Sequence, residues 1–377
     1  MSLIEQEIKN GIDVAEIGFF TFSKAAVGEA MQRMGVDSDE APWFKTLHSF
    51  AYQVLNLKYN NVFNEKDTKR LATKLGLPRP IGTKDFIHSK TINTTDVHKY
   101  IYEQLRIRGC QLEDLKYPYC DVETLEAWTN GMKEYKDKFV KQDFIDMISR
   151  TAELDPVIFP EFKVLICDEL QDLNKPQWEI LFKLIGRAEK VYLAGDDDQC
   201  IYSFNGSDIS PMLNLEKTHG FEKEILQKSW RVPKSIWAHS QRLIQRLEGR
   251  YAKKVAPRND EGYIESCVSS QRLMNVVSKV DPEDTVLFLS RSNTRLKEQQ
   301  KRFGNYFFDK KKVEYSTIHN AKGKEADVVF LDLHRSKWTR KFSTLEEEIR
   351  VHYVGMTRAK KKLYLLPASE GFTIDIS

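Results

Sequence analysis

The chain has 377 residues, of which 41% are hydrophobic and 30% charged, and its formal net charge is +3. This length suits two or more domains, and the apolar share is that of a globular protein with a sizeable core. No apolar run approaches the roughly 20 residues of a membrane-spanning helix, and residues 1–10 lack the apolar core of an export signal, so we expect a cytoplasmic protein that is neither membrane-bound nor secreted.

The five cysteines are scattered and show no metal-ligand spacing, which is typical of reduced intracellular thiols. A net charge near zero neither requires nor excludes nucleic acid, because a local basic groove can lie on a near-neutral protein.

The first 50 residues alternate between helical and strand patterns. Residues 1–10 are predicted to end a helix, with Gly11 as its stop. Residues 17–22 are predicted to form a buried strand, Ser23 can cap the helix after it, and a second helix is predicted to follow residues 46–50.

Residues 55–140 are rich in Lys, Asn, Asp and Tyr and show no strong strand, which predicts a mostly helical insertion. Strand patterns return at Val164–Cys167 and Val191–Ala194, with a helix from about Pro176 to Ile185 between them. This order predicts a right-handed βαβ unit whose active groups lie at the carboxyl ends of parallel strands.

A second series of apolar strands is predicted to begin near Glu224 and to continue at 285–289, 328–331 and 363–366. Helical stretches separate these strands, so the fold class is predicted to be α/β with two lobes. We place the first lobe at 1–220, with its helical insertion at about 55–140, and the second lobe at 221–377. Positions 233 and 315 are only 82 residues apart, so little beyond the second lobe itself fits between them.

Carboxylates follow both strands of the predicted βαβ unit. Asp168 and Glu169 follow the first strand, and three aspartates, Asp196 to Asp198, follow the second. Proteins that bind Mg²⁺ and a nucleoside triphosphate place an Asp here to hold the metal and a Glu to deprotonate the attacking water. If Asp168 and Glu169 stood alone, two solvated acids would be the preferred interpretation. The second acidic cluster, one βαβ unit later, favours a functional site instead.

Aromatic residues lie just beyond the second acidic cluster. Tyr202 and Phe204 could stack on bases of single-stranded nucleic acid, at about 1–3 kcal/mol per base. An acidic turn with two core aromatics explains the same segment about equally well when it is considered alone.

Nine segments in order resemble the motifs of UvrD/Rep-type superfamily 1 helicases. Seven of the segments resemble motifs Ia, Ib, II, III, IV, V and VI, and these are, in the same order, Thr21–Ala26, Thr46–Phe50, Asp168–Asp172, Gly195–Gly206, Leu226–Arg231, Ser316–Glu325 and Glu347–Ala359. The other two, Asp143–Met147 and Leu289–Asn293, resemble stretches that lie between these motifs in the family. Each match is weak alone, but their order and their span of almost the whole chain make the resemblance specific.

The resemblance implies two RecA-like lobes that use ATP and Mg²⁺ to unwind DNA with 3′–5′ polarity. It assigns Mg²⁺ to Asp168 and Glu169, and catalysis to Glu169, Gln199, Arg231 and Arg358. The nucleotide would be held by Trp230, Arg231, Glu325 and Arg358, with Trp230 in place of the usual Tyr on the adenine. The expected DNA contacts are Thr46, His48, Tyr202, Phe204, Thr317 and His319. The expected partners are single-stranded DNA and single-strand/double-strand junctions, with replication or repair proteins as further candidates.

Some of these residues also have simpler interpretations. His48 and His319 could be satisfied interior histidines, and Arg350 is better explained as the ion-pair partner of a nearby acid. Lys310–Lys312 is better explained as a solvated turn than as a DNA clamp.

The chain lacks the Gly-x-x-x-x-Gly-Lys-Ser/Thr loop that cradles phosphates in this family. This absence predicts the loss of most nucleotide affinity, so the chain alone is expected to be a weak or inactive ATPase. Because the downstream motifs are retained, we expect Met1 to be an internal methionine of a longer protein. The alternative function is a single-stranded nucleic-acid-binding module or subunit without ATPase activity.

Overall fold

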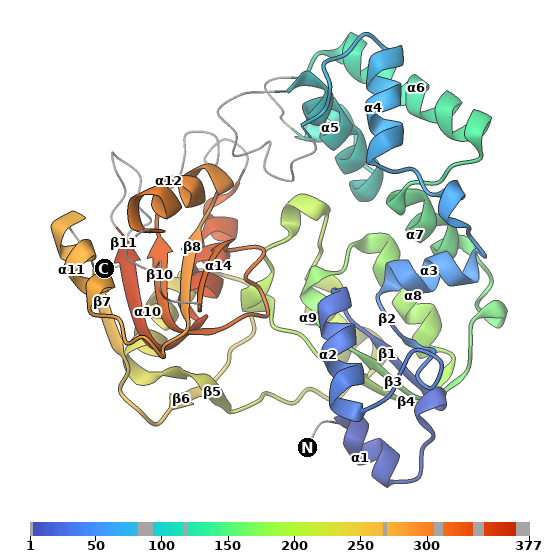
Figure 1. Cartoon of the computed structure of the whole chain (residues 1–377). Helices are drawn as coiled ribbons and strands as arrows, with labels where there is room; N and C mark the ends of the chain where they lie inside the picture. Colours follow the sequence, from blue (N-terminus) through green and yellow to red (C-terminus); the bar gives the residue numbers. More distant parts are fainter. Residues whose placement is uncertain are drawn as a thin grey trace. The chain divides into compact units, whose positions relative to one another are not determined.

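A computed structural model describes residues 3–81, 93–115, 120–266, 270–304, 312–334 and 343–366 (Figure 1). The described residues fall into two compact units. The first contains 3–81, 93–196 and 202–212, and the second contains 197–201 and the described residues from 213 onward. In the described part of the chain, no helix is both long enough and apolar enough to cross a bilayer.

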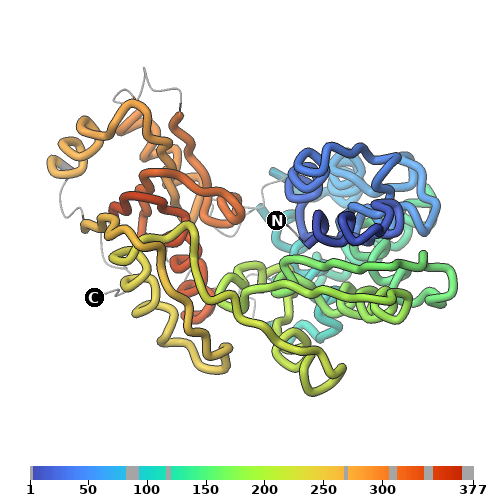
Figure 2. Tube along the Cα trace, turned by 90° about the horizontal axis from the view of Figure 1, so that it is seen from below, coloured from blue at the N-terminus to red at the C-terminus, as the bar shows by residue number. Residues whose placement is uncertain are grey.

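The first unit is built on a parallel four-stranded sheet with the order β2-β1-β3-β4. Its strands are β1 (Ile17–Phe20), β2 (Phe44–Lys45), β3 (Phe162–Cys167) and β4 (Ala188–Leu193). Phe20 pairs with Cys167, and Cys167 pairs with Leu193, so three strands end at the same edge. In Figure 2 the blue and green segments of this unit run side by side, in agreement with the pairing of β1 and β3.

Helices cover both faces of this sheet. Ile17, Phe19, Val164 and Ile166 share one apolar cluster with residues of α1 (Leu3–Lys9) and α2 (Lys24–Met34). On the other face, the Phe20 ring meets Phe50 of α3 (Leu47–Val54) edge to face, with centroids 5.5 Å apart. Then α7 (Phe144–Glu153) packs on α3 and on α8 (Lys175–Ile185), which connects β3 to β4. The predicted βαβ order is therefore present.

Side-chain caps begin two of these helices, and the second, which was expected to follow residues 46–50, already begins at Leu47. Ser23 Oγ accepts from the Ala26 amide at 3.1 Å, and Thr46 Oγ1 accepts from the Ser49 amide at 3.2 Å, so each satisfies a free N–H of a first helical turn. Strand β1 ends at Phe20 and not at Phe22, because the chain turns into the cap at Ser23.

The predicted insertion is helical in its described parts, with α4 (Glu65–Lys74), α5 (Thr94–Arg108) and α6 (Val122–Phe139). Its core contains the fully buried Trp128. Tyr135 of α6 donates to Asp67 of α4 at 2.9 Å, and Lys141 also pairs with Asp67, so a buried carboxylate is fully compensated.

The second unit has a parallel five-stranded sheet with the order β7-β11-β10-β8-β9. The strands are β7 (Tyr263–Ser266), β8 (Val286–Ser290), β9 (Val313–Thr317), β10 (Ala326–Asp332) and β11 (Ala359–Leu366). Stacked rings of Phe288, Phe330 and Tyr364 run through its core, with centroids 4.5 and 5.1 Å apart.

The remaining described elements of this unit are a two-stranded pair and several helices. The pair is β5 (Lys228–Pro233) with β6 (Ala256–Arg258), and the helices are α10 (Lys234–Ile244), α11 (Ser270–Ser278), α12 (Asn293–Phe303) and α14 (Leu345–Met356). Helix α9 (Ser210–His219) contains the residue at which the chain passes into this unit. The strand predicted near Glu224 was wrong, because residues 221–227 are irregular and β5 begins at Lys228.

Both units have the α/β architecture of RecA-like lobes, with parallel sheets flanked by helices. The lobe boundary predicted at 220 stays a prediction.

Candidate functional site

The two acids that follow β3 lie at the carboxyl edge of the first sheet. The Asp168 amide donates to Phe20 O at 2.9 Å, and its carboxylate accepts from the Glu169 amide at 2.8 Å. Glu169 has φ of 60°, a left-handed conformation that is uncommon and strained for a residue with a side chain. The sharp turn therefore presents two adjacent carboxylates at the end of one strand.

Gln171 connects this turn to the end of β4. Its amide nitrogen donates to the Glu169 carboxylate, and its Oε1 accepts from the Asp196 amide at 2.9 Å. Only 1% of Gln171 is exposed, and a Cβ on Gly195 would lie 2.9 Å from the same oxygen. The sequence grouped Gln171 with the acids but did not predict this role, which requires knowing that the two strand ends are adjacent.

A small pocket opens beside Asp168 between the ends of β1 and β3 and the start of α3. It has room for about one water molecule, and its lining includes Thr21, Thr46, His48 and Gln177. Thr21 is 4% exposed, and its Oγ1 has no hydrogen-bond partner among the described residues. A buried hydroxyl without a partner is costly, so this oxygen is placed to bind a water molecule.

Two of the expected DNA contacts, Thr46 and His48, line this pocket. Thr46 is 7% exposed because its hydroxyl caps α3. Burial lowers the pKa of His48 to about 4, so its ring is neutral at pH 7. Phe144, which the sequence did not single out as a site residue, lies edge to face with His48 at 5.6 Å and is 58% exposed.

The aromatic turn after β4 lies in the first unit and packs on Phe22, which precedes α2, and on α5. Tyr202 stacks on Phe22 with ring centroids 4.9 Å apart, and it meets Phe204 edge to face at 5.9 Å. Burial raises the pKa of Tyr202, and the nearby Asp172 and Glu169 charges add to the effect. Phe22 already covers one face of Tyr202, so that face is not available to a base.

Helix α5 of the insertion fixes this aromatic turn. Tyr100 donates to Phe204 O at 3.3 Å, and Arg108 donates to Ser203 O at 2.8 Å. Gly206 ends the turn with φ of 77°, and a Cβ there would lie 2.2 Å from Ile107 Cγ2. The insertion is thus part of the structure that places the aromatic residues.

In the second unit, β5 carries two residues predicted to contact the nucleotide. Arg231 Nε donates to Glu325 at 2.7 Å, and this bond lowers the pKa of the Glu325 carboxyl. Trp230 is 77% exposed, and the Lys228 ammonium lies 4.2 Å from the centroid of its indole ring. This edge of the unit therefore carries the exposed indole ring of Trp230 together with the ion pair of Arg231 and Glu325.

Arg358 lies directly after α14 and is 1% exposed. Its Nε donates to Val354 O at 2.9 Å, and its Nη2 donates to Thr357 Oγ1 at 3.1 Å and to Gln199 Oε1 at 3.2 Å. The structure therefore brings together two residues that are 159 positions apart in the sequence and that were both predicted to be catalytic.

Thr317 and His319 lie at the end of β9 and just beyond it. Thr317 is 5% exposed, and its Oγ1 accepts from the Asn320 amide at 3.3 Å. A nitrogen of the His319 ring lies 3.2 Å from Arg291, which pairs with the buried Glu348.

Two of the simpler interpretations can be compared with the structure. Arg350 lies 3.9 Å from Glu346, as expected of an ion-pair partner, and also donates to Asp197 O at 3.2 Å. Lys312 pairs with Glu283 at 3.1 Å, whereas Lys310 and Lys311 lie outside the described residues.

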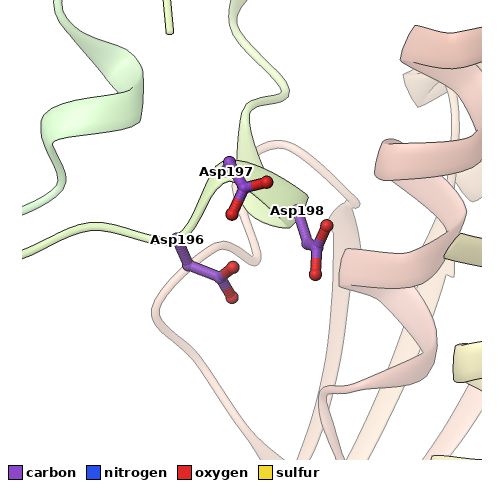
Figure 3. Close-up of side chains that lie close together, drawn as sticks. All are labelled: Asp196, Asp197 and Asp198. Atoms are coloured by element: carbon purple, nitrogen blue, oxygen red, sulfur yellow. The ribbon is translucent and has the colours of Figure 1, made fainter. Parts of the chain in front are cut away.

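Asp196, Asp197 and Asp198 hold carboxylate oxygens within 4.8 Å of one another (Figure 3). Asp197 and Asp198 are 1% and 2% exposed, and Arg250 and Lys253 of the same unit pair with them. These two acids are therefore neutralised by protein cations, and the structure gives them no metal role.

The predicted site residues thus form two groups. The first unit contains Thr46, His48, Asp168, Glu169, Tyr202 and Phe204, and the second contains Gln199, Trp230, Arg231, Thr317, His319, Glu325 and Arg358.

Comparisons with known proteins place both parts of the chain in one family of proteins. The family model described as UvrD/REP helicase N-terminal domain matches residues 1–220, and the UvrD-like helicase C-terminal domain matches 312–366.

The chain is 26% identical over 266 residues to the ATP-dependent DNA helicase PcrA of Bacillus subtilis, covering 64% of this chain and 35% of that protein. Staphylococcus aureus PcrA is 24% identical, covering 69% of this chain and 37% of its own length. DNA helicase II of Escherichia coli is 25% identical, with coverages of 62% and 34%. The chain spans about a third of the length of these relatives.

Proposed function

Because the chain belongs to the UvrD/REP helicase family, we propose that it acts in an ATP-dependent DNA helicase or translocase that moves 3′–5′ on single-stranded DNA. The observation that carries this proposal is the hydrogen bond between Gln199 and the buried Arg358. In this proposal the buried guanidinium and the glutamine amide to which it donates would together sense and stabilise a transferred phosphoryl group.

The donor set at the end of β3 fits a hard cation such as Mg²⁺. Asp168 and Glu169 offer carboxylate oxygens at a strand edge, the ligand type that Mg²⁺ prefers together with substrate phosphates. Bound Mg²⁺ would neutralise charge on the phosphates of ATP. Glu169 would orient the attacking water and accept its proton, while Arg231 and Arg358 would donate to the γ-phosphate.

The second unit would supply the remaining contacts to ATP. Trp230 offers an exposed ring for the adenine, and Glu325 offers an acceptor for a sugar hydroxyl. These 377 residues contain no Walker A sequence. Hydrolysis in this proposal therefore depends on a phosphate loop from another segment, either of a longer form of the protein or of a partner chain.

Single-stranded DNA and its junctions with duplex would be the nucleic-acid partner. Thr46, His48, Thr317 and His319 would contact the backbone, while Tyr202 and Phe204 would stack on bases. Replication or repair proteins, and a cytoplasmic location, stay predictions at the level of the family.

ATP hydrolysis with and without a (dT) oligonucleotide tests the proposal, on this chain and on a form extended upstream to include a Walker A loop. We expect DNA-stimulated hydrolysis in the extended form, and a loss of at least about 100-fold in Glu169→Gln and in Arg358→Ala. The exposed residues give matched controls, Glu179→Gln and Arg242→Ala, which should retain activity.

DNA binding without hydrolysis in either form would contradict the helicase proposal and support the binding-module alternative. Full activity in Glu169→Gln would contradict the assigned role of that residue.

A further inference from the structure

Residues Asp197–Gln199 form a single 3₁₀ turn that we call the Gln199 turn. We propose that Arg250 and Lys253 are positioning residues that hold this turn so that the Gln199 side chain meets Arg358. The inference rests on the proposed function, in which the hydrogen-bonded pair of Gln199 and Arg358 serves ATP hydrolysis, and it adds two residues to that site. All the residues involved belong to the second unit.

Arg250 holds the turn with two parallel bonds. Its Nε donates to Asp198 Oδ1 at 2.7 Å, and its Nη2 donates to the other oxygen of the same carboxylate. The side chain of Asp198 is 3% exposed and that of Arg250 is 14% exposed. A bidentate pair at this burial fixes the orientation of the carboxylate as well as its charge, and Asp198 precedes Gln199 directly in the chain.

Lys253 and the backbone of the same loop complete the contact. The Lys253 ammonium bonds Asp198 at 3.0 Å and also pairs with Asp197, and the Tyr251 amide donates to Asp197 Oδ2 at 2.9 Å. The 250–253 loop lies between α10 and β6, far in the sequence from the motifs named above.

The other end of the turn is held through its carbonyl groups. Lys322 donates to Gln199 O at 3.1 Å, and Arg350 donates to Asp197 O at 3.2 Å. These bonds place the backbone, but they do not engage the two buried carboxylates. The two carboxylates are held by Arg250, Lys253 and the Tyr251 amide, all from one loop.

Arg358 is the fixed reference for Gln199. It donates to Val354 O, Thr357 Oγ1 and Lys324 O as well as to Gln199. Because the guanidinium is already held from several sides, the Gln199 bond forms only when the turn brings Oε1 to it. Loss of the 250–253 contacts would release Gln199 and leave Arg358 in place.

Hydrogen–deuterium exchange of the whole chain tests the holding of the turn without requiring catalysis. In Arg250→Ala and in Lys253→Ala, we expect amides of 197–201 to exchange at least about tenfold faster, while β3 and β10 exchange as in the unchanged protein. Lys254→Ala, which removes an exposed lysine from the same loop, is the matched control and should leave exchange unchanged.

A second variant separates positioning from simple charge compensation. Arg250→Ala combined with Asp198→Asn leaves no uncompensated buried charge, so the melting temperature should return toward that of the unchanged protein. Exchange in 197–201 should stay fast, because the new amide has no guanidinium with which to restore the bidentate contact. Normal exchange of 197–201 in Arg250→Ala, or in this double variant, would overturn the proposal.

ATP hydrolysis by the extended form then asks whether the contact acts through Gln199. We expect Arg250→Ala to lower kcat about tenfold with little change in the KM for ATP, and to have no further effect in a Gln199→Ala background. If Arg250→Ala lowered kcat by the same factor in the Gln199→Ala background as in the unchanged protein, the positioning role would be overturned. An unchanged protein that does not hydrolyse ATP would contradict the proposed function, and the exchange experiment would still decide whether the turn is held as inferred.

Discussion

His48 shows at the scale of one residue how burial changes the chemistry of a side chain. Its ring lies among the residues of the pocket beside Asp168, and burial lowers its pKa to about 4. An interior histidine can still line a pocket, so the DNA contact expected of His48 stays a prediction. In the proposed DNA contact it would act as a neutral hydrogen-bonding group and not as a cation.

The lowered pKa predicts a pH-dependent contribution to stability. In the unfolded chain His48 has a pKa near 6.5, so between about pH 6.5 and 4 it is protonated there but stays neutral in the folded protein. The contribution of His48 to stability is therefore present above pH 6.5 and is lost as the pH falls toward 4. His48→Gln should reduce the fall in unfolding free energy between pH 7 and 4.5 by about 2 kcal/mol, measured by urea unfolding. His219→Gln, at an exposed site, should leave it unchanged. If the unfolding free energy of His48→Gln fell by as much between pH 7 and 4.5 as that of the unchanged protein, the result would contradict a buried, neutral His48 ring.

Gly206 gives a second prediction for a single residue. Alanine there would adopt a left-handed φ and would also collide with Ile107 of α5, so Gly206→Ala should cost about 2–3 kcal/mol of unfolding free energy and weaken binding of single-stranded DNA. Gly35→Ala has a similar φ of 67° with open space around its Cβ, so it should cost only about 1 kcal/mol and leave DNA binding intact. Equal effects of the two substitutions would show that the contact with α5 does not matter.

At the scale of elements, charge joins the insertion to the first lobe. Arg106 of α5 pairs with Asp143 and Asp146 at the start of α7, and Lys136 of α6 pairs with the same two acids at 2.9 and 2.8 Å. Asp143 and Asp146 also cap α7 by accepting from each other's amides. The segment Asp143–Met147, which resembles a stretch of the helicase family, therefore also joins α5, α6 and α7 to one another.

This arrangement predicts that the network responds to the loss of one cation. Lys136→Met keeps most of the apolar stem but leaves two partly buried carboxylates with a single Arg, so it should cost about 2 kcal/mol in urea unfolding. Lys138→Met, on an exposed part of the same helix, should change stability by less than about 0.5 kcal/mol. A cost for Lys136→Met no greater than that of Lys138→Met would mean that Arg106 alone compensates both acids.

At the scale of the whole molecule, charge predicts how DNA binding depends on salt. The net charge is +3, and the DNA contacts proposed above are threonines, histidines and aromatic residues, without Lys or Arg. Because each neutralised phosphate of a single strand contributes about 0.7 to the slope of log K against log salt, we expect a slope below about 2 in magnitude. Fluorescence anisotropy of a labelled (dT) oligonucleotide across a salt series measures this slope. A value steeper than about 4 would move the main DNA contacts to lysines and arginines.

Local patterns were sufficient for many of the elements. The cap at Ser23 and the apolar strands β3, β8, β10 and β11 were predicted, because each depends on neighbours within one turn or one strand, whereas the cap at Thr46 was not predicted. Strands β2, β7 and β9 were not predicted. Strand β2 has two residues, and β9 mixes polar and apolar residues at an edge of its sheet.

The sequence by itself determined the family, the α/β class and the identity of the acids at the strand ends, because motif order and hydrophobic runs are properties of the chain alone. Only the tertiary structure decided that Gln171 connects two strand ends, that α5 fixes the aromatic turn, and that Arg250 and Lys253 neutralise Asp197 and Asp198. These contacts join residues that are 25 to 104 positions apart. A carboxylate looks the same in the sequence whether it awaits a metal or already has an arginine, and the difference lies in which distant side chain the fold brings to it.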